Sequence, residues 1–181
     1  MPRGNPDPAR PARIALAALE VVGERGVEGL THRAVAKAAG VPVGSTTYHF
    51  KTLEDLLAAA ITEAKKASDV DLLHWAERIT PQTEIAAALA DYVIDLLDNN
   101  WTRLVVELEL YLAALRRPNL LTLSRAWDEA LPTVLRTHLD PLSARAMALA
   151  VDGFLLHAMI HGKPDRDEVE EVLRRIAARS E

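Results

Sequence analysis

Five consecutive side chains that can form hydrogen bonds stand out near the N-terminal third of the sequence. They are Ser45, Thr46, Thr47, Tyr48 and His49. A helix that serves only packing does not place polar groups around a whole turn. A helix in the major groove of DNA needs donors and acceptors for base edges and phosphates near its N-terminal end. The run therefore predicts a DNA-recognition helix, and the alternative is a polar surface turn with no partner.

The residues before this run supply the other half of a helix-turn-helix pattern. Thr31 is a good N-cap for a short helix, and Gly40 ends that helix because glycine enters the left-handed conformation without strain. Pro42 stiffens the turn, and Gly44 opens the second helix. The pattern predicts two short helices joined by a tight turn, the second of which carries the polar run.

Residues 26–57 resemble the DNA-binding module of the tetracycline-repressor (TetR) family of bacterial transcriptional regulators. The features that carry the resemblance are Gly26, Gly29, Thr31, the Ala39-Gly40-Val41 turn, Gly44, the Tyr48-His49-Phe50 run and the helix restart at Thr52.

The resemblance implies an all-α fold with two domains. A helix-turn-helix domain is expected at residues 1–51, and a helical effector-binding and dimerisation domain at residues 52–181, with residues 52–67 as the connecting helix. The residues expected to contact DNA bases or phosphates are Thr31, His32, Arg33, Gly44, Ser45, Thr46, Thr47, Tyr48, His49 and Lys51.

The composition fits such a fold. Of the 181 residues, 49% are apolar and only 4% are aromatic, which favours helices packed through aliphatic and alanine side chains. The absence of cysteine excludes disulfides, thiolate metal sites and cysteine nucleophiles. We find no apolar run expected to span a membrane and no signal-peptide pattern. A cytoplasmic protein without a membrane partner is therefore expected.

The charge is distributed unevenly along the chain. The net charge of −5 is unusual for a DNA-binding protein. Residues 1–51, however, carry seven Lys and Arg against four Asp and Glu, a net charge of +3. Residues 52–181 carry fourteen against twenty-two, a net charge of −8. The basic surface is therefore expected at the helix-turn-helix end, and the acidic remainder away from DNA.

The first ten residues are rich in proline and predict a disordered arm. Arg3, Arg10 and Arg13 are placed to reach a phosphate or the minor groove. An arm with no role in binding is an equal alternative.

The periodicity and capping residues predict a succession of helices. The expected spans are 11–25, 52–67, 81–98, 101–116, 119–138, 141–161 and 165–179, besides the helix-turn-helix pair. Thr80-Pro81 and Asp140-Pro141 are read as an N-cap followed by proline at the first helical position, and Asp165 with Glu168 as a capping box. Pro132 is expected to kink the 119–138 helix.

The 101–116 helix is apolar on nearly every side, which is typical of the middle of a bundle. Glu107 and Glu109 are the exceptions, and an interior carboxylate is costly unless it is paired or serves a ligand. Both lie at partly exposed positions or pair with Arg103 or Arg136; alternatively, one faces a pocket and attracts a basic ligand. The residues expected to line a ligand site are Tyr92, Trp101, Glu107, Tyr111, Trp127, Phe154 and His157. The alternative for the aromatic members is a place in the core.

The last two predicted helices carry apolar stripes that a single chain of this size does not easily cover. By resemblance they form a four-helix dimer interface with a second copy; the alternative is the core of a monomer. The residues expected at the interface are Phe154, Ala158, Val169, Val172 and Ile176.

His157 and His161 have a spacing that can hold a metal ion on one helix face, but no third ligand is evident. Two core or interface histidines, with no metal and no cofactor, are expected. No phosphate-binding loop, dinucleotide-binding pattern or nucleophile motif occurs, so enzymatic activity has no positive support.

These features predict a homodimeric, TetR-like transcriptional regulator whose partners are operator DNA, a second copy of itself and a small-molecule effector that releases it as a repressor. The main alternative is a DNA-binding regulator without an effector. An enzyme or metal-binding bundle that uses the two histidines is the third possibility.

Overall fold

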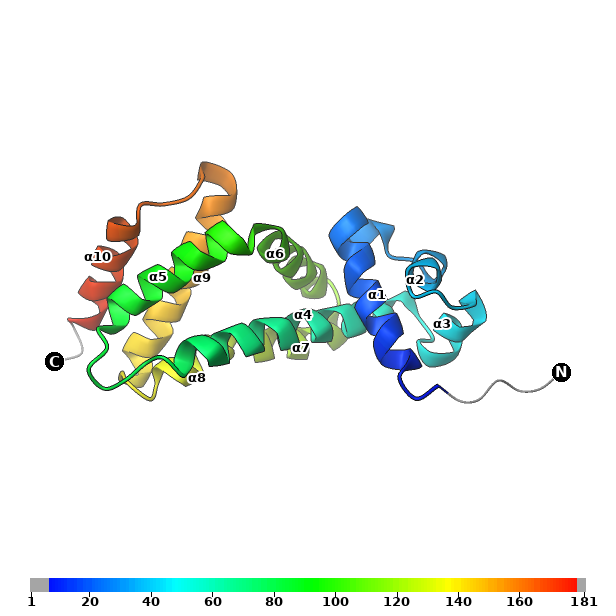
Figure 1. The fold of residues 1–181 in the computed structure, drawn as a ribbon, viewed down its shortest axis with the longest axis horizontal. Helices are drawn as coiled ribbons and strands as arrows, with labels where there is room; N and C mark the ends of the chain where they lie inside the picture. The colour runs from blue at the N-terminus through cyan, green and yellow to red at the C-terminus, as the bar shows by residue number, and fades with distance from the viewer. Residues whose placement is uncertain (1–6, 179–181) are drawn as a thin grey trace. The chain divides into compact units, whose positions relative to one another are not determined.

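The computed structural model describes residues 7–178, and within this range the chain is helical with no strand (Figure 1). The α-helices are α1 Arg10–Arg25, α2 His32–Ala38, α3 Val43–His49, α4 Leu53–Ala76, α5 Ile85–Asn99, α6 Trp101–Leu115, α7 Leu121–Asp128, α8 Ala130–Leu135, α9 Pro141–His161 and α10 Arg166–Ala177. Two short 3-10 helices cover Val27–Gly29 and Pro118–Leu120. The predicted all-α class is confirmed. Of the arm arginines, Arg3 lies outside the described residues.

The chain divides into two compact units. The N-terminal unit comprises Met1–Lys66 and Val106–Leu123, and the C-terminal unit comprises Ala67–Val105 and Ser124–Glu181. The division falls within the residue ranges of α4 and α6. These are units of packing, and the functional boundary expected between residues 51 and 52 stays a prediction.

The N-terminal unit begins with a three-helix arrangement of α1, α2 and α3. One face of α1 is fully buried, including Ile14, Val21 and Val22. The Thr31 hydroxyl accepts the Ala34 amide at 3.1 Å, as expected of an N-cap. Gly40 has φ +64°, which is the left-handed conformation that the sequence predicts for the end of the first short helix.

A reciprocal cap starts α4 directly after α3. The Thr52 hydroxyl accepts the Asp55 amide at 3.0 Å, and the Asp55 carboxylate accepts the Thr52 amide at 2.9 Å. These bonds hold the pKa of the Asp55 carboxyl below its usual value, the bond from the Thr52 amide having the largest effect. The helix continues to Ala76 and is longer than the predicted 52–67 span.

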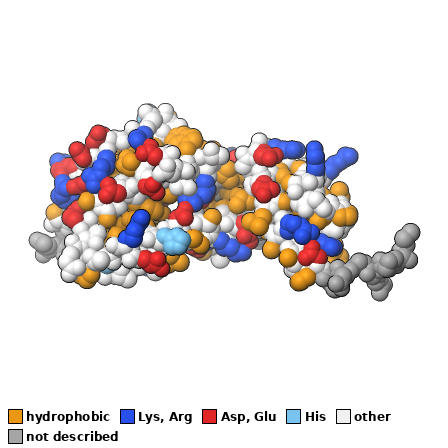
Figure 2. Space-filling model, in the orientation of Figure 1, with side chains coloured by type: hydrophobic (Ala, Val, Ile, Leu, Met, Phe, Trp, Pro, Cys, Tyr) orange, Lys and Arg blue, Asp and Glu red, His pale blue; other side chains and the backbone are white. Residues whose placement is uncertain are grey.

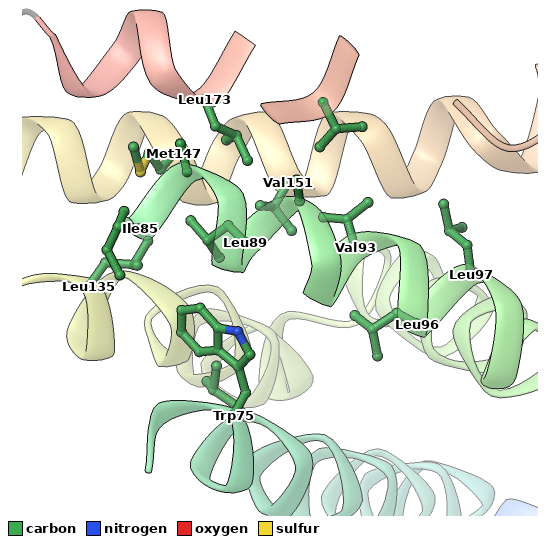
Figure 3. Packing of buried hydrophobic residues seen from close by; sticks show 14 of the residues in the cluster. Trp75, Ile85, Leu89, Val93, Leu96, Leu97, Leu135, Met147, Val151 and Leu173 are labelled. Carbon is green, nitrogen blue, oxygen red and sulfur yellow. The ribbon is translucent and has the colours of Figure 1, made fainter. Parts of the chain in front are cut away.

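The core of the C-terminal unit is built around α5, which contributes Ile85, Leu89 and Val93 (Figure 3). Met147 from α9 and Leu173 from α10 pack against the same cluster. Figure 3 shows the Trp75 ring directed from α4 toward α5, and its indole N–H donates to the Ala88 carbonyl at 3.2 Å. The C-terminal end of α4 is thereby fixed to this core.

Polar bonds on the outside of α10 add to the apolar packing. The Arg166 side chain donates to Asp91 of α5 at 2.7 Å and to Glu170 on its own helix. Arg174 bonds to Glu170 and Glu171. Figure 2 shows acidic and basic side chains intermingled over α5 and α10. Such exposed pairs contribute little stability individually and mainly fix the position of the helix.

Two predicted helix spans are wrong in detail. Thr80-Pro81 does not begin a helix, because Thr83 binds the Thr80 amide in a turn and Glu84 caps α5 by accepting the Ala86 and Ala87 amides. The predicted 119–138 helix is divided into α7 and α8. Pro132 cannot donate a backbone bond, and this is sufficient to interrupt the helix instead of kinking it.

Candidate nucleic-acid interface, ligand residues and dimer surface

The exposed side of α3 carries most of the predicted recognition residues. Tyr48 is 72% exposed, and Thr47 is also exposed. Ser45 and His49 are half-buried. The helix begins at Val43, so its N-terminal turn contains Gly44 and Ser45, and the Ser45 amide donates to the Pro42 carbonyl at 2.8 Å. A DNA backbone and base edges would meet this surface first.

Thr46 is a correction to the sequence analysis, which placed it among the DNA contacts. Its side chain is completely buried. The hydroxyl donates to the Val43 carbonyl at 2.7 Å and lies 3.3 Å from the His32 Nδ1 atom. Its apolar methyl and a satisfied hydroxyl suit a buried position between α2 and α3. Thr46 therefore positions His32 and the two helices, and does not reach a base from this site.

The positively charged side chain of Lys51 lies just after the C-terminal end of α3. The Lys51 ammonium is 5.4 Å from the centre of the Tyr48 ring, and the His49 ring meets the same tyrosine edge-to-face at 5.0 Å. Thr31 and Arg33 are exposed at the start of α2, and His32 is half-buried there. Lys and Arg side chains lie on the surface over α1 and α2 in Figure 2. The arrangement suits an anionic, hydrogen-bonding partner.

Gly44 has no internal reason to be glycine. A Cβ atom placed on it would meet nothing within 4 Å, and its φ is not in the left-handed region. An alanine would fit the free protein and would favour the helix. The missing side chain instead leaves room for a partner to approach the backbone of the first turn of α3.

The predicted ligand residues fall into both units. Tyr92, Trp101, Trp127, Phe154 and His157 belong to the C-terminal unit, whereas Glu107 and Tyr111 belong to the N-terminal unit. Tyr92 packs against the Trp75 ring at 5.3 Å, and both Tyr92 and Phe154 lie against the core of the C-terminal unit. Trp101 is 41% exposed and His157 is exposed. Trp127 is half-buried on α7.

Two acidic residues of the C-terminal unit were missed by sequence reasoning. Burial raises the pKa of the Asp152 carboxyl on α9 to about 6, and repulsion by Asp128 on α7 adds to the effect. Asp152 is nevertheless accessible to solvent. No periodicity in the sequence signals that α7 and α9 bring these charges together.

Glu109, one of the two carboxylates considered for a ligand, has a protein partner. Its Oε1 atom accepts the backbone N–H of Val27 at 2.6 Å within the N-terminal unit.

The predicted dimer residues divide into buried and exposed groups. Val169 is 0% exposed and Ala158 2% exposed, and both belong to the core of the C-terminal unit, so their assignment to the interface is wrong. Phe154 and Ile176 are half-buried, and Val172 is 38% exposed. The apolar stripes on α9 and α10 thus include residues, such as Ala158 and Val169, that belong to the chain's own core.

The exposed face of α9 carries a longer apolar stripe than the sequence analysis recognised. Its members are Leu142, Ala146, Leu149, Gly153, Leu156 and Ile160. They alternate at spacings of four and three residues, which places them along one face of the helix. Leu142 is 77% and Ile160 72% exposed. A groove of about 700 Å³ between α9 and α10 includes Leu142, Ala146, Val172 and Ile176 in its lining.

Comparison with known proteins places these features in a family. Residues 14–60 match the description "Bacterial regulatory proteins, tetR family", and residues 80–179 match "Tetracyclin repressor-like, C-terminal domain". The chain belongs to the TetR family of transcriptional regulators. The exposed helix α3 is therefore part of the helix-turn-helix that binds DNA in this family.

The TetR assignment is supported by solved structures over nearly the whole chain. A multidrug binding protein, EbrR, complexed with imidazole is 39% identical with a TM-score of 0.86, covering 94% of this chain and 96% of that one. EbrR complexed with ethidium is 38% identical with a TM-score of 0.83, covering 93% and 98%. A TetR-family member from Streptomyces coelicolor A3 is 39% identical with a TM-score of 0.82, covering 94% and 99%.

A curated relative matches this chain over most of the length of both proteins. The HTH-type transcriptional regulator BetI of Stenotrophomonas maltophilia is 25% identical over 171 residues, which cover 90% of this chain and 87% of the relative. BetI is named as a transcriptional regulator, in agreement with the family assignment.

Helix α9 is unusually long and apolar. By length and composition it meets the requirements for crossing a membrane, although the sequence analysis found no such run. Only 33% of the apolar 18-residue stretch within this helix is buried inside the chain. The exposed apolar stripe from Leu142 to Ile160 accounts for much of the part that is not buried.

The two histidines of α9 face each other without further metal-binding groups nearby. The His157 and His161 rings are 5.6 Å apart. Among residues 7–178, no three His, Asp or Glu side chains are grouped so that they can hold a metal ion.

Proposed function

We propose that this TetR-family chain is a homodimeric repressor that leaves its operator when a small cationic molecule binds. The observation that carries the proposal is the exposed surface of α3, where Thr47 and Tyr48 face solvent beside Lys51. Such side chains suit base edges and phosphates, and the family assignment supplies the class of partner.

Dimerisation is supported by the apolar stripe of α9. Leucines that are 45–77% exposed are unfavourable in water when they form one continuous face. A second copy offers an identical face, as two-fold symmetry requires. Ala146 and Gly153 lie between the leucines, and no atom within 4 Å would oppose a Cβ on Gly153. These small residues leave space for the close approach of a partner helix.

A dimer also suits DNA recognition. One α3 helix has only seven residues and reads few base pairs. Two copies related by a two-fold axis read two half-sites, whose centres lie about 34 Å apart or a multiple of that distance.

The ligand class is supported by charge as well as by similarity. EbrR has been solved with ethidium, proflavin and malachite green. These dyes are aromatic cations. In this chain, the carboxylates of Asp128 and Asp152 are close enough to interact, and Trp127 lies next to the first of them. A cation would relieve their repulsion, and an aromatic wall would stack with its rings.

Release is proposed to act through the separation of the two recognition helices. Helix α4 follows α3 after a connection that contains Lys51 and Thr52. A small tilt of α4 would therefore move α3. Packed helices exchange between discrete arrangements, which allows a ligand to act at a distance. A tenfold loss of operator affinity requires about 1.4 kcal/mol of preference for the released arrangement.

The proposal is tested with duplexes selected from a random library by the wild-type protein. We expect a specific duplex to be retained and ethidium to lower its affinity at least about tenfold. Asp152→Asn is expected to weaken ethidium binding, followed by dye fluorescence, while operator affinity without dye stays unchanged. Asp95→Asn, an exposed substitution on α5, is the charge-matched control.

Each result has a defined meaning. Failure to retain any duplex would contradict a DNA-binding regulator. Specific DNA binding that ethidium, proflavin and malachite green all leave unchanged would favour the alternative of a regulator without such an effector. Loss of dye binding in Asp95→Asn as well would show a general charge effect instead of a site at Asp152.

A further inference from the structure

The contact between Glu109 and Val27 joins residues that are 82 positions apart in the chain. Glu109 lies on α6, and Val27 opens the 3-10 helix that connects α1 to α2. The N–H groups at the start of a helix have no partner within it. The Glu109 carboxylate supplies one from another helix, and a bond to an ionised acceptor is among the stronger hydrogen bonds of a protein.

The neighbouring glycine fits this contact in two ways. Gly26 has φ +70°, a conformation that side chains other than glycine rarely adopt. A Cβ atom at this position would also lie 2.8 Å from the Glu109 Oε1 atom. The turn between α1 and α2 is therefore shaped so that a carboxylate can approach its backbone closely.

Helix α6 is held by polar contacts at both of its parts. Before residue 106 it belongs to the C-terminal unit, where Arg103 forms an ion pair with Asp71 of α4. From Val106 onward it belongs to the N-terminal unit, where Glu109 binds Val27. A second bond in that unit joins Asn119, just after α6, to Glu54 at the start of α4 at 3.2 Å.

We propose that Glu109 is a positioning residue for DNA binding, which fixes the turn between α1 and α2, and with it the three-helix bundle, to helix α6. The role deepens the proposed function, because it assigns part of the coupling to α6 in addition to α4. Neither Glu109 nor Val27 belongs to α3. Its loss therefore changes the placement of the recognition helix without removing a contact to DNA.

The bond is tested directly by amide hydrogen exchange in the full-length protein, resolved by NMR. In Glu109→Ala we expect exchange at the Val27 amide to accelerate at least about tenfold, since a hydrogen-bonded amide becomes free. Glu109→Gln retains an acceptor oxygen and is expected to keep most of the protection. Amides in the middle of α9 are expected to be unchanged in both variants, which shows that the fold is intact.

The positioning role is tested by operator affinity without any effector. Glu109→Ala is expected to bind the selected duplex about three- to tenfold more weakly than the wild type, with Glu109→Gln intermediate. Glu28→Ala, which removes one carboxylate from the 3-10 turn that Glu109 contacts, is the matched control and is expected to have no such effect. Gly26→Ala is expected to resemble Glu109→Ala, because it displaces the carboxylate.

The outcomes separate this inference from the proposed function. Unchanged Val27 exchange in Glu109→Ala would overturn the contact itself. Faster exchange with unchanged operator affinity would overturn the positioning role. If the wild type retains no duplex, the proposed function fails and the positioning role fails with it, whereas the exchange result still decides whether the Glu109 contact exists.

Discussion

At the residue scale, the side chains of α3 divide into those that face solvent and one that holds the motif together. The five consecutive polar residues were all expected to contact DNA, because their order alone gives no information on burial. The structure places Thr46 inside, bonded to Val43 and close to His32, whereas Thr47 and Tyr48 face outward. Helical geometry separates neighbours by about 100°, so a run of five polar residues includes at least one inward position.

Gly44 gives a prediction that separates folding from binding. Gly44→Ala is expected to raise the free energy of unfolding by roughly 0.5–1 kcal/mol, because alanine favours a helix and its Cβ meets no atom of the protein. Specific DNA affinity is expected to fall at least about tenfold as the added methyl group blocks close approach to the first turn of α3. Thermal unfolding and titration of the selected duplex measure the two effects. Unchanged DNA affinity would contradict the interface at this turn.

Asp152 gives a prediction on pH dependence. Its folded-state pKa of about 6 lies above that of an unfolded aspartate, so the folded chain binds more protons between about pH 4 and pH 6. Stability from this group is therefore highest below pH 4 and falls as the pH rises through 6. Asp152→Asn is expected to remove this loss of stability. The free energy of unfolding of the variant should therefore rise relative to that of the wild type between pH 4 and pH 7.

Urea unfolding at a series of pH values measures this effect. An identical pH profile in Asp152→Asn and wild type would show that the carboxyl is not desolvated. Because Asp152 is accessible to water, the change is expected to be smaller than its pKa alone suggests.

At the element scale, the sequence predicts helices best where caps and stripes agree. Asp140 accepts the Leu142 amide at 2.9 Å and Asp165 the Asp167 amide at 2.8 Å, and both caps were identified from residue type. Thr80-Pro81 has equally good residue types, but Thr83 uses the Thr80 amide and keeps the segment in a turn. Competing local bonds of this kind are decided by geometry that the sequence does not reveal.

The two faces of α9 illustrate a second limit. Its apolar residues were expected to form a dimer interface, yet Met147, Val151 and Ala158 are buried in the chain's own core. A helix that is apolar on both faces gives no indication of which face remains open. Only the packing against α5, α8 and α10 assigns the outward face to Leu142, Leu149 and Ile160.

This outward face can be tested by one charge. Leu149→Arg is expected to abolish the dimer, because it places a charge in an apolar interface at a cost of several kcal/mol. Leu73→Arg on α4 is the matched control, since both leucines are 58% exposed. Sedimentation velocity measures the association, and circular dichroism confirms that both variants remain helical. A dimer that persists in Leu149→Arg would place the interface elsewhere.

At the scale of the whole molecule, a dimer doubles every contact to DNA. Lys51→Ala is expected to weaken binding to all duplex sequences and to lower the slope of log affinity against log salt. Each lost phosphate contact changes this slope by about 0.9, so a dimer loses about two units and a monomer about one. Affinities between 50 and 200 mM salt measure the difference. An unchanged slope would contradict the phosphate contact of Lys51.

The N-terminal unit is assembled from two separate stretches, and this affects how the chain matures during synthesis. Residues 106–123 complete a unit that begins with residues 1–66, so the ribosome adds 57 further residues before the whole unit has been synthesised. At 5–20 residues per second this takes about 3–11 s. Chains released at residue 66 are expected to be cleaved faster by protease than chains released at residue 123. In the interval the nascent regulator has its helix-turn-helix sequence but lacks Glu109, and we expect it to fold into a competent DNA reader only after α6 has emerged.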